Sequence, residues 1–188
     1  MYIPKHFSIT DEEEIQRFIG NNSFGELISG AGGELDSTHM PFLLSADNST
    51  LLGHMAKANP HWQQLRQRQV LVSLWGPHGY ISPSWYSRPG VPTWDYQAVH
   101  IYGTANSFDD PDRLKAVVDS LTRFHESDFK TQWQPDYASD KLRGIVGIEI
   151  KIQKVQCKYK LNQERTDEER AEVASQLEKL DNKRLAIA

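Results

Sequence analysis

The chain has 188 residues, of which 38% are hydrophobic and 24% charged, and its formal net charge is −4. This length suits one domain, and this balance is typical of a soluble globular protein rather than a disordered one. Lys and Arg are scattered among acidic residues, which argues against direct DNA binding, because DNA-binding domains usually carry a basic stripe. No apolar run approaches the ~20 residues of a membrane helix, and the first residues lack an apolar signal core, so we expect no membrane segment and a cytoplasmic location.

The N-terminal half predicts one helix followed by short strands. Thr10 as N-cap and Glu13 three residues later form a capping box, and the helix that they open ends near Gly20. Strands are expected at residues 24–29, 35–45, 50–56 and 70–75. Pro41 interrupts the second of them, which places it at an edge or a bulge. Gly30 to Gly33 form a turn, and Pro60 suits the first turn of a short helix over residues 61–67.

The C-terminal half predicts an irregular segment, three further strands and two helices. Strands are expected at residues 97–108, 146–152 and 155–161. An amphipathic helix follows Asp109, residues 129–141 are irregular, and a capping box of Thr166 and Glu169 opens a charged helix from about 166 to Leu180. Six or more short strands with three helices predict a mainly β, α+β fold: an antiparallel barrel with helical additions, in one domain over residues 1–188.

Residues 76–96 form the most unusual segment, with four prolines and five large aromatic residues. The prolines argue against a helix or a central strand through most of it, and the aromatic surface argues against disorder. Rigid prolines and planar side chains suit a wall around a flat ligand. They suit equally well a structural loop packed on the barrel or on a dimer partner, and composition favours neither.

Residues 53–62 are a second candidate, because an expected strand runs there into a helix start. Free backbone N–H groups at a helix start favour an anion, and Lys57, Asn59 and His61 add donors. The segment is therefore a candidate phosphate cradle. The alternative is ordinary, with Asn59 as N-cap, Lys57 in solvent and Trp62 in the core.

The histidines give no metal-ligand spacing. No His-x-Glu or His-x-x-x-His pair with supporting cysteines is present, so we expect no tight metal site. Haem ligation stays open, because it needs only one histidine in a pocket. No Gly-x-Ser-x-Gly turn is present, which argues against a serine hydrolase, and no catalytic residue is identified.

Cys157 is the only cysteine, which excludes an internal disulfide and agrees with a reducing compartment. It stands in an alternating Val-Gln-Cys-Lys-Tyr pattern, so we interpret it as a small strand residue rather than a reactive thiol.

Several stretches of the chain match a known family. They are residues 1–7, 38–42, 53–62, 76–86, 91–96, 99–103 and 158–165. The run Gly-Pro-His-Gly-Tyr-Ile-Ser-Pro-Ser-Trp-Tyr within them is long and unusual in composition. In these stretches the chain resembles the PaiB family, which is described as FMN-binding negative transcriptional regulators.

The resemblance implies a split barrel related to pyridoxamine-phosphate oxidases and flavin reductases, and a homodimer with FMN at the subunit interface. By analogy, the FMN phosphate and ribityl chain face His54, Met55, Ala56, Lys57, Asn59, His61 and Trp62. The isoalloxazine ring lies near Ile81, Ser82, Ser84, Trp85 and Tyr86.

A third matching stretch resembles the family's Lys-Leu-Ser-Gln-Asn motif through Lys160 and Gln163, which are further candidate cofactor contacts. The chain departs from this motif at Asn162 and Glu164. The negative charge of Glu164 argues against an anion-binding role for this loop.

The resemblance implies a probable regulator of transcription that acts through flavin or small-molecule binding. The alternative of another class is an FMN-dependent oxidoreductase, in which the flavin does the redox chemistry and the protein supplies binding and electrostatics. A weaker alternative is a haem-binding or haem-degrading split barrel.

Overall fold

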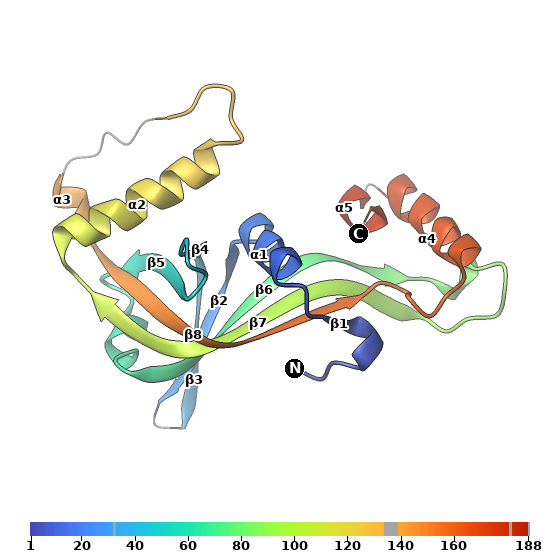
Figure 1. The fold of residues 1–188 in the computed structure, drawn as a ribbon, viewed down its shortest axis with the longest axis horizontal. Helices are drawn as coiled ribbons and strands as arrows, with labels where there is room; N and C mark the ends of the chain where they lie inside the picture. Colours follow the sequence, from blue (N-terminus) through green and yellow to red (C-terminus); the bar gives the residue numbers. More distant parts are fainter. Residues whose placement is uncertain (32, 134–138, 181, 188) are drawn as a thin grey trace. The chain divides into compact units, whose positions relative to one another are not determined.

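A computed structural model describes residues 1–31, 33–133, 139–180 and 182–187 of the chain (Figure 1). The described part forms two compact units. Met1–Ile15, Trp75–Val99 and Gln156–Ala188 make the first unit, and Gln16–Leu74 and His100–Val155 make the second. Three long strands run through both units, so this division leaves the prediction of a single domain undecided. Each unit is described by itself below.

The described strands form one eight-stranded sheet in the order β3-β2-β6-β7-β8-β5-β4, with β1 paired to β8. The strands are β1 (Ser8–Ile9), β2 (Phe24–Ala31), β3 (Glu34–Pro41), β4 (Leu43–Leu44), β5 (Thr50–Ala56), β6 (Arg68–Ile81), β7 (Thr93–Phe108) and β8 (Ile145–Lys160). The registered pairs β1–β8, β2–β3, β2–β6, β4–β5 and β5–β8 are all antiparallel. The expected antiparallel α+β architecture is therefore confirmed.

The described helices are η1 (Lys5–Phe7), α1 (Glu12–Asn21), η2 (Pro60–Gln64), η3 (Pro83–Trp85), α2 (Pro111–Glu126), α3 (Ser139–Leu142), α4 (Asp167–Lys179) and α5 (Lys183–Ala186). The predicted capping box at the start of α4 is present, with both the Thr166 and Glu169 side chains bonded to backbone N–H groups. At α1 the capping acceptor is Asp11, whose Oδ1 accepts from the Glu14 N–H at 2.9 Å, so the predicted Thr10–Glu13 box is wrong.

The second unit is built on the β2–β3 hairpin and on the pairing of β5 with β8. The hairpin register runs from Phe24 opposite Pro41 to Ala31 opposite Glu34, and Gly33 at its turn has a φ of 93°, which favours glycine. Gly32 of the predicted turn lies outside the described residues. Helix α2 buries Leu114, Val117 and Leu121 and contacts β5, as its apolar period predicts.

The first unit carries α4 and α5 on the ends of the long strands. Its core cluster consists of Ile81, Tyr86, Val173, Leu177 and Leu185, with Trp85, Leu161 and Ala186 packed against it. A Cβ added to Gly79 of β6 would lie 2.9 Å from Leu185 Cδ2 and 3.0 Å from Asn182 Nδ2. The absence of a side chain at Gly79 therefore allows the helices to approach the strand closely.

The segment of residues 76–96 is less irregular than its prolines predict. Strand β6 continues through Pro77 to Ile81, and β7 begins at Thr93, so only the connection between them is free of strand. Gly76, Gly79 and Ile81 are buried while Tyr80 is exposed, which shows that packing on one face maintains the strand despite the proline.

Three smaller predictions also differ from the structure. The expected helix over 61–67 is the shorter 3-10 turn η2, and Gln67 beyond it has a φ of 55°. The two expected strands at 146–152 and 155–161 are one continuous strand, β8. Within the expected irregular stretch 129–141, α3 begins at Ser139, while residues 134–138 lie outside the described part.

Candidate functional site

The residues that the sequence predicts at the flavin divide between the two units. His54, Met55, Ala56, Lys57, Asn59, His61 and Trp62 belong to the second unit. Ile81, Ser82, Ser84, Trp85, Tyr86, Lys160 and Gln163 belong to the first. Within each unit, the structure places these residues on adjoining segments of the chain.

In the second unit, backbone and side-chain hydrogen bonds fix the turn between β5 and η2. Asn59 caps η2, since its Oδ1 accepts from the His61 N–H at 3.0 Å. The indole N–H of Trp62 donates to the Lys57 carbonyl at 3.0 Å, and the Lys57 N–H donates to the Gly144 carbonyl at 2.8 Å. These bonds give the segment a defined shape without using the Lys57 side chain.

The His61 ring is part of this framework rather than a free donor. It is 2% exposed, and its two ring nitrogens lie 2.8 Å from Ser29 Oγ and 2.8 Å from Thr38 Oγ1. Asn59 Nδ2 donates to the same Thr38 hydroxyl at 3.0 Å. Burial lowers the pKa of His61, so the ring is held neutral and satisfied. His61 and Asn59 therefore shape the turn, and a ligand would need other groups.

Two groups of the segment keep unused hydrogen-bonding capacity. The exposed Lys57 ammonium has no partner among the residues that the structure describes. His54 Nδ1, on β5, is buried and has no hydrogen-bond partner, and burial lowers the pKa of this ring. A lysine charge and an imidazole nitrogen without a partner are groups that can bind a phosphate.

Arg143 is distant from Lys57 in the sequence, but the tertiary structure places it next to the turn between β5 and η2. The bond from the Lys57 N–H to the Gly144 carbonyl places the exposed Arg143 next to the turn. Its sequence neighbours give no signal for this role, because the contact depends on the pairing of Ala56 with Ile145 across β5 and β8. We name Lys57, His54 and Arg143 the cationic corner.

In the first unit, most of the predicted residues already have structural partners. Ile81 is fully buried, and Tyr86 is 8% exposed. Ser82 caps η3 by accepting from the Ser84 N–H at 3.2 Å, and the two hydroxyls lie 2.8 Å apart. Trp85 is half-buried against the core cluster. Ser82, Ser84 and Trp85 therefore remain the accessible members of this set.

Gln163 and Lys160 also make local bonds. The Gln163 side chain donates to the Tyr159 carbonyl at 2.6 Å and accepts from the Leu161 N–H at 2.7 Å, which closes the turn after β8. Lys160 Nζ donates to Thr93 Oγ1 at 2.6 Å and to the Trp94 carbonyl at 2.8 Å. Both side chains thus hold the ends of β7 and β8 together.

Asp95 is the polar residue that sequence reasoning missed. It is 3% exposed, and its Oδ2 accepts from Asn162 Nδ2 at 2.5 Å, while Asn162 Oδ1 accepts from the Tyr86 hydroxyl at 3.2 Å. Lys160 Nζ lies 3.7 Å from Asp95 Oδ1, which is an ion pair but too long for a hydrogen bond. Burial raises the pKa of Asp95 to about 6, against the opposing effect of the Lys160 charge.

Asn162 reaches this network because its backbone has a φ of 58°, a region that asparagine tolerates better than most residues. The sequence shows Asn162 only as a departure from the family motif. In the structure the departure supplies the amide that links Asp95 to Tyr86.

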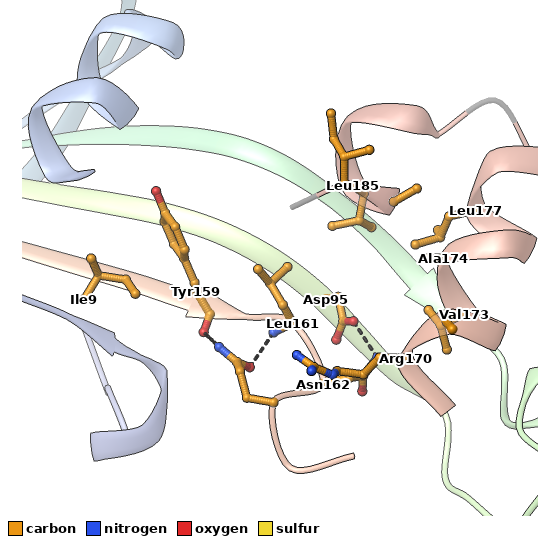
Figure 2. Close-up of a pocket in the computed structure, with 14 residues that line it drawn as sticks. Ile9, Asp95, Tyr159, Leu161, Asn162, Arg170, Val173, Ala174, Leu177 and Leu185 are labelled. Atoms are coloured by element: carbon orange, nitrogen blue, oxygen red, sulfur yellow. Dashed lines mark hydrogen bonds between the residues drawn. The ribbon is translucent and has the colours of Figure 1, made fainter. Parts of the chain in front are cut away.

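A cavity of about 490 Å³ lies beside this network in the first unit (Figure 2). On the α4–α5 side its wall includes Val173, Ala174, Leu177 and Leu185. Ile9, Tyr159 and Leu161 line it from the strand side, and Asp95 and Asn162 form a polar end. We name this space the C-terminal cavity.

The first unit also exposes large aromatic side chains. Trp75 and Trp94 are each 56% exposed and Tyr80 is 48% exposed, and the Tyr80 and Trp94 rings contact at 6.1 Å between centroids. Neighbouring exposed aromatic rings are typical of an interaction surface.

Comparison with known proteins places the chain in a family. Residues 1–154 match the family described as "Putative FMN-binding domain". The chain is 39% identical to the Bacillus subtilis "Protease synthase and sporulation protein PAI 2", over 97% of this chain and 91% of that protein. The protein belongs to the PaiB family. A second relative, an uncharacterised protein of Emericella nidulans, is 30% identical over 88% of this chain and 86% of its own length.

Solved structures of more distant proteins share the fold of this PaiB-family chain. The FAD- and haem-binding protein of Mycobacterium smegmatis has a TM-score of 0.68 at 14% identity, over 86% of this chain and 78% of that chain. A Bacteroides thetaiotaomicron protein described as a "putative 5-nitroimidazole antibiotic resistance protein" has a TM-score of 0.63 at 16% identity, over 80% of this chain and 85% of that chain. The fold is therefore the expected split barrel.

Two features are absent from the part of the chain that the structure describes. No helix in this part of the chain is long and apolar enough to cross a membrane. Within the same ranges, no group of three or more His, Cys, Asp or Glu side chains is placed to hold a metal ion.

Proposed function

We propose that the protein binds FMN and that the cationic corner holds the FMN phosphate. The observation that carries this proposal is the exposed Lys57 ammonium, which has no partner among the described residues, in the segment that leads from β5 into η2. His54 Nδ1, a buried ring nitrogen without a partner, belongs to the same segment. Membership in the PaiB family supports the choice of ligand. A bound flavin would supply redox chemistry, and the chain would supply binding, orientation and charge.

Each residue of the second-unit segment has a separate part in this proposal. Lys57 and Arg143 provide positive charge for the phosphate, and His54 provides a hydrogen bond. Asn59, His61 and Trp62 keep the turn rigid, so the charged groups need little ordering when the ligand binds. Trp85 of the first unit is proposed separately as a contact of the isoalloxazine ring, on the family resemblance alone.

At the level of the molecule we propose a cytoplasmic homodimer that acts on gene expression through flavin or small-molecule binding. The net charge of −4 supports an indirect route over direct contact with DNA. The exposed rings of Trp75, Tyr80 and Trp94 support self-association, because contiguous aromatic surface is typical of subunit interfaces.

The phosphate contact is tested by replacing Lys57 with alanine and measuring FMN affinity by flavin fluorescence. We expect the dissociation constant to rise about tenfold, since a charge-assisted hydrogen bond contributes about 1.5–3 kcal/mol. Lys130→Ala is the matched control, because Lys130 is exposed in the second unit and outside the corner. FMN affinity equal to that of the wild type in both Lys57→Ala and Arg143→Ala would reject the cationic corner.

The same purified protein serves to test the contact of Trp85 with the isoalloxazine ring and the two alternative functions, oxidoreductase and haem binding. Trp85→Ala, checked for folding by circular dichroism, should weaken FMN and riboflavin equally, because both carry the ring. Anaerobic bleaching of bound flavin by NADH or NADPH would favour the oxidoreductase alternative. A haem absorbance band in the purified protein would favour the haem-binding one.

A further inference from the structure

The C-terminal cavity contains a buried acceptor that the protein itself does not use. Asp95 is 3% exposed, and its Oδ1 has no hydrogen-bond partner among the described residues. Asn162 occupies the other oxygen, Oδ2, at 2.5 Å. Leaving a buried carboxylate oxygen without a hydrogen bond is unfavourable, so Oδ1 marks a position where a donor would be stabilised.

The lining of the cavity restricts the chemistry of the rest of the ligand that carries this hydrogen-bond donor. Beside the polar residues Asp95, Asn162, Gln163 and Arg170, the wall is formed largely by aliphatic side chains, including Val173, Leu177 and Leu185 from the two helices. A volume of about 490 Å³ is within the ~300–1,000 Å³ of pockets that hold small organic ligands. A ligand that fits this space therefore has an apolar body.

The charges around Asp95 restrict the donor further. Lys160 Nζ lies 3.7 Å from Oδ1 and compensates the carboxylate charge without donating a hydrogen bond to it. A second cation at Oδ1 would meet the Lys160 ammonium, so a neutral hydroxyl or N–H group fits better. Arg170, which also lines the cavity, is exposed and paired with Asp167 at 2.5 Å.

We propose that the C-terminal cavity is a binding site for a neutral, mostly apolar small molecule that donates one hydrogen bond to Asp95 Oδ1. The apolar body lies between α4–α5 and the strand side of the cavity, against Ala174 and Leu161. The site is independent of the proposed FMN phosphate contact, because none of the cationic-corner residues lines it. Most of its helical wall lies beyond residue 154, where the match to the FMN-binding family ends.

The test compares two probes, of which one has a hydroxyl donor and the other has that hydroxyl capped by a methyl group. At pH 7.5, 2-naphthol is neutral and carries a hydroxyl, whereas 2-methoxynaphthalene keeps the rings without the donor. Calorimetric titration of the full chain should show saturable binding of 2-naphthol, at least about tenfold tighter than 2-methoxynaphthalene. 2-Naphthylmethylammonium, which adds a positive charge, should bind more weakly than 2-naphthol.

Two variants, each with a matched control, separate the hydrogen bond to Asp95 from the apolar contacts of the cavity wall. Asp95→Leu should abolish the preference for 2-naphthol over 2-methoxynaphthalene, and Asp128→Asn, at an exposed carboxyl of the second unit, should preserve it. Ala174→Trp should fill the cavity and abolish binding of both probes. Ala116→Trp, the same change at an exposed position of α2, should leave binding intact.

Several outcomes would overturn the proposal. They are no saturable binding of 2-naphthol to the wild type, equal affinity for 2-naphthol and 2-methoxynaphthalene, and full binding in a folded Ala174→Trp variant. Displacement of 2-naphthol by FMN would assign the cavity to the flavin and overturn its independence. Because FMN affinity is measured separately, failure here leaves the proposed FMN site standing.

Discussion

His61 and Asp95 show two different ways of burying a polar side chain in this protein. Both ring nitrogens of His61 have hydroxyl partners at 2.8 Å, so burial leaves nothing unsatisfied. Asp95 has one satisfied oxygen and one that lacks a hydrogen bond, and the nearest charge is Lys160 at 3.7 Å. The first arrangement belongs to the framework, whereas the second is typical of a residue that is kept for binding.

The raised pKa of Asp95 predicts a definite pH dependence of stability. The pKa rises from 3.8 in the unfolded chain to about 6 in the fold because burial disfavours the charged carboxylate. The stabilising contribution is therefore complete below about pH 4 and is lost as the pH rises through about 6. The free energy of unfolding of the wild type, relative to Asp95→Asn, should fall by about 3 kcal/mol in all, about 2 kcal/mol of it between pH 4.5 and 7.5.

Urea denaturation of both proteins at pH 4.5, 6 and 7.5 measures this difference. Glu164, which also raises the Asp95 pKa, and Tyr86 are unchanged in the variant, so they contribute to both curves. A constant difference between the two proteins across this range would show that Asp95 ionises normally in the fold.

At the scale of elements, hydrophobic periodicity predicted those helices and strands whose formation depends on neighbouring residues in the sequence. It placed α2 and the strand expected at residues 146–152, because alternating or helical apolar spacing determines which face is buried, whereas the capping box of Thr166 and Glu169 placed α4. It failed between residues 76 and 81, where β6 continues through Pro77 because Gly79 and Ile81 pack beneath α4 and α5. Long-range packing of this kind has no local signal.

The same distinction applies to the candidate site. The segments around Lys57 and Trp85 were found from the sequence, because prolines, aromatics and a helix start are visible there. Arg143 and Asp95 were not found, since one depends on the β5–β8 register and the other on a turn that places Asn162 against β7. The spacing of neighbouring residues in the sequence gives no signal for either contact.

The space around two strand glycines, Gly103 and Gly79, predicts how strongly an alanine at each position lowers the stability of the fold. A Cβ at Gly103 of β7 would collide with the backbone carbonyl oxygen of Lys151, whereas at Gly79 it would meet the ends of two side chains. We expect Gly103→Ala to lower the free energy of unfolding by about 2 kcal/mol or more, and Gly79→Ala by less than about 1 kcal/mol.

Gly20 near the end of α1 is the internal control for this series. No heavy atom lies within 4 Å of a Cβ built there, so Gly20→Ala should leave stability unchanged or raise it by up to about 1 kcal/mol. Urea denaturation of the three variants ranks them. A Gly103→Ala variant as stable as Gly79→Ala would contradict the close strand approach.

At the scale of the whole molecule, the exposed aromatic rings of the first unit predict self-association. Trp94→Glu places a charge where Trp94 contacts Tyr80, and it should shift a dimer towards monomer in sedimentation velocity. Leu35→Glu is the control, because Leu35 is 81% exposed on the edge strand β3 of the other unit. A monomeric wild type, or a Trp94→Glu variant that stays dimeric, would reject this surface as the interface.

The central claim, that the cationic corner binds the phosphate of FMN, is tested most directly by titrating the full chain with FMN and with riboflavin. The two ligands share the isoalloxazine ring and the ribityl chain, and they differ in the phosphate alone. The account predicts saturable FMN binding with a dissociation constant of tens of micromolar or lower, roughly 6 kcal/mol or more, and riboflavin binding at least about tenfold weaker. Equal affinity for the two flavins, or no saturable FMN binding in this range, would contradict it.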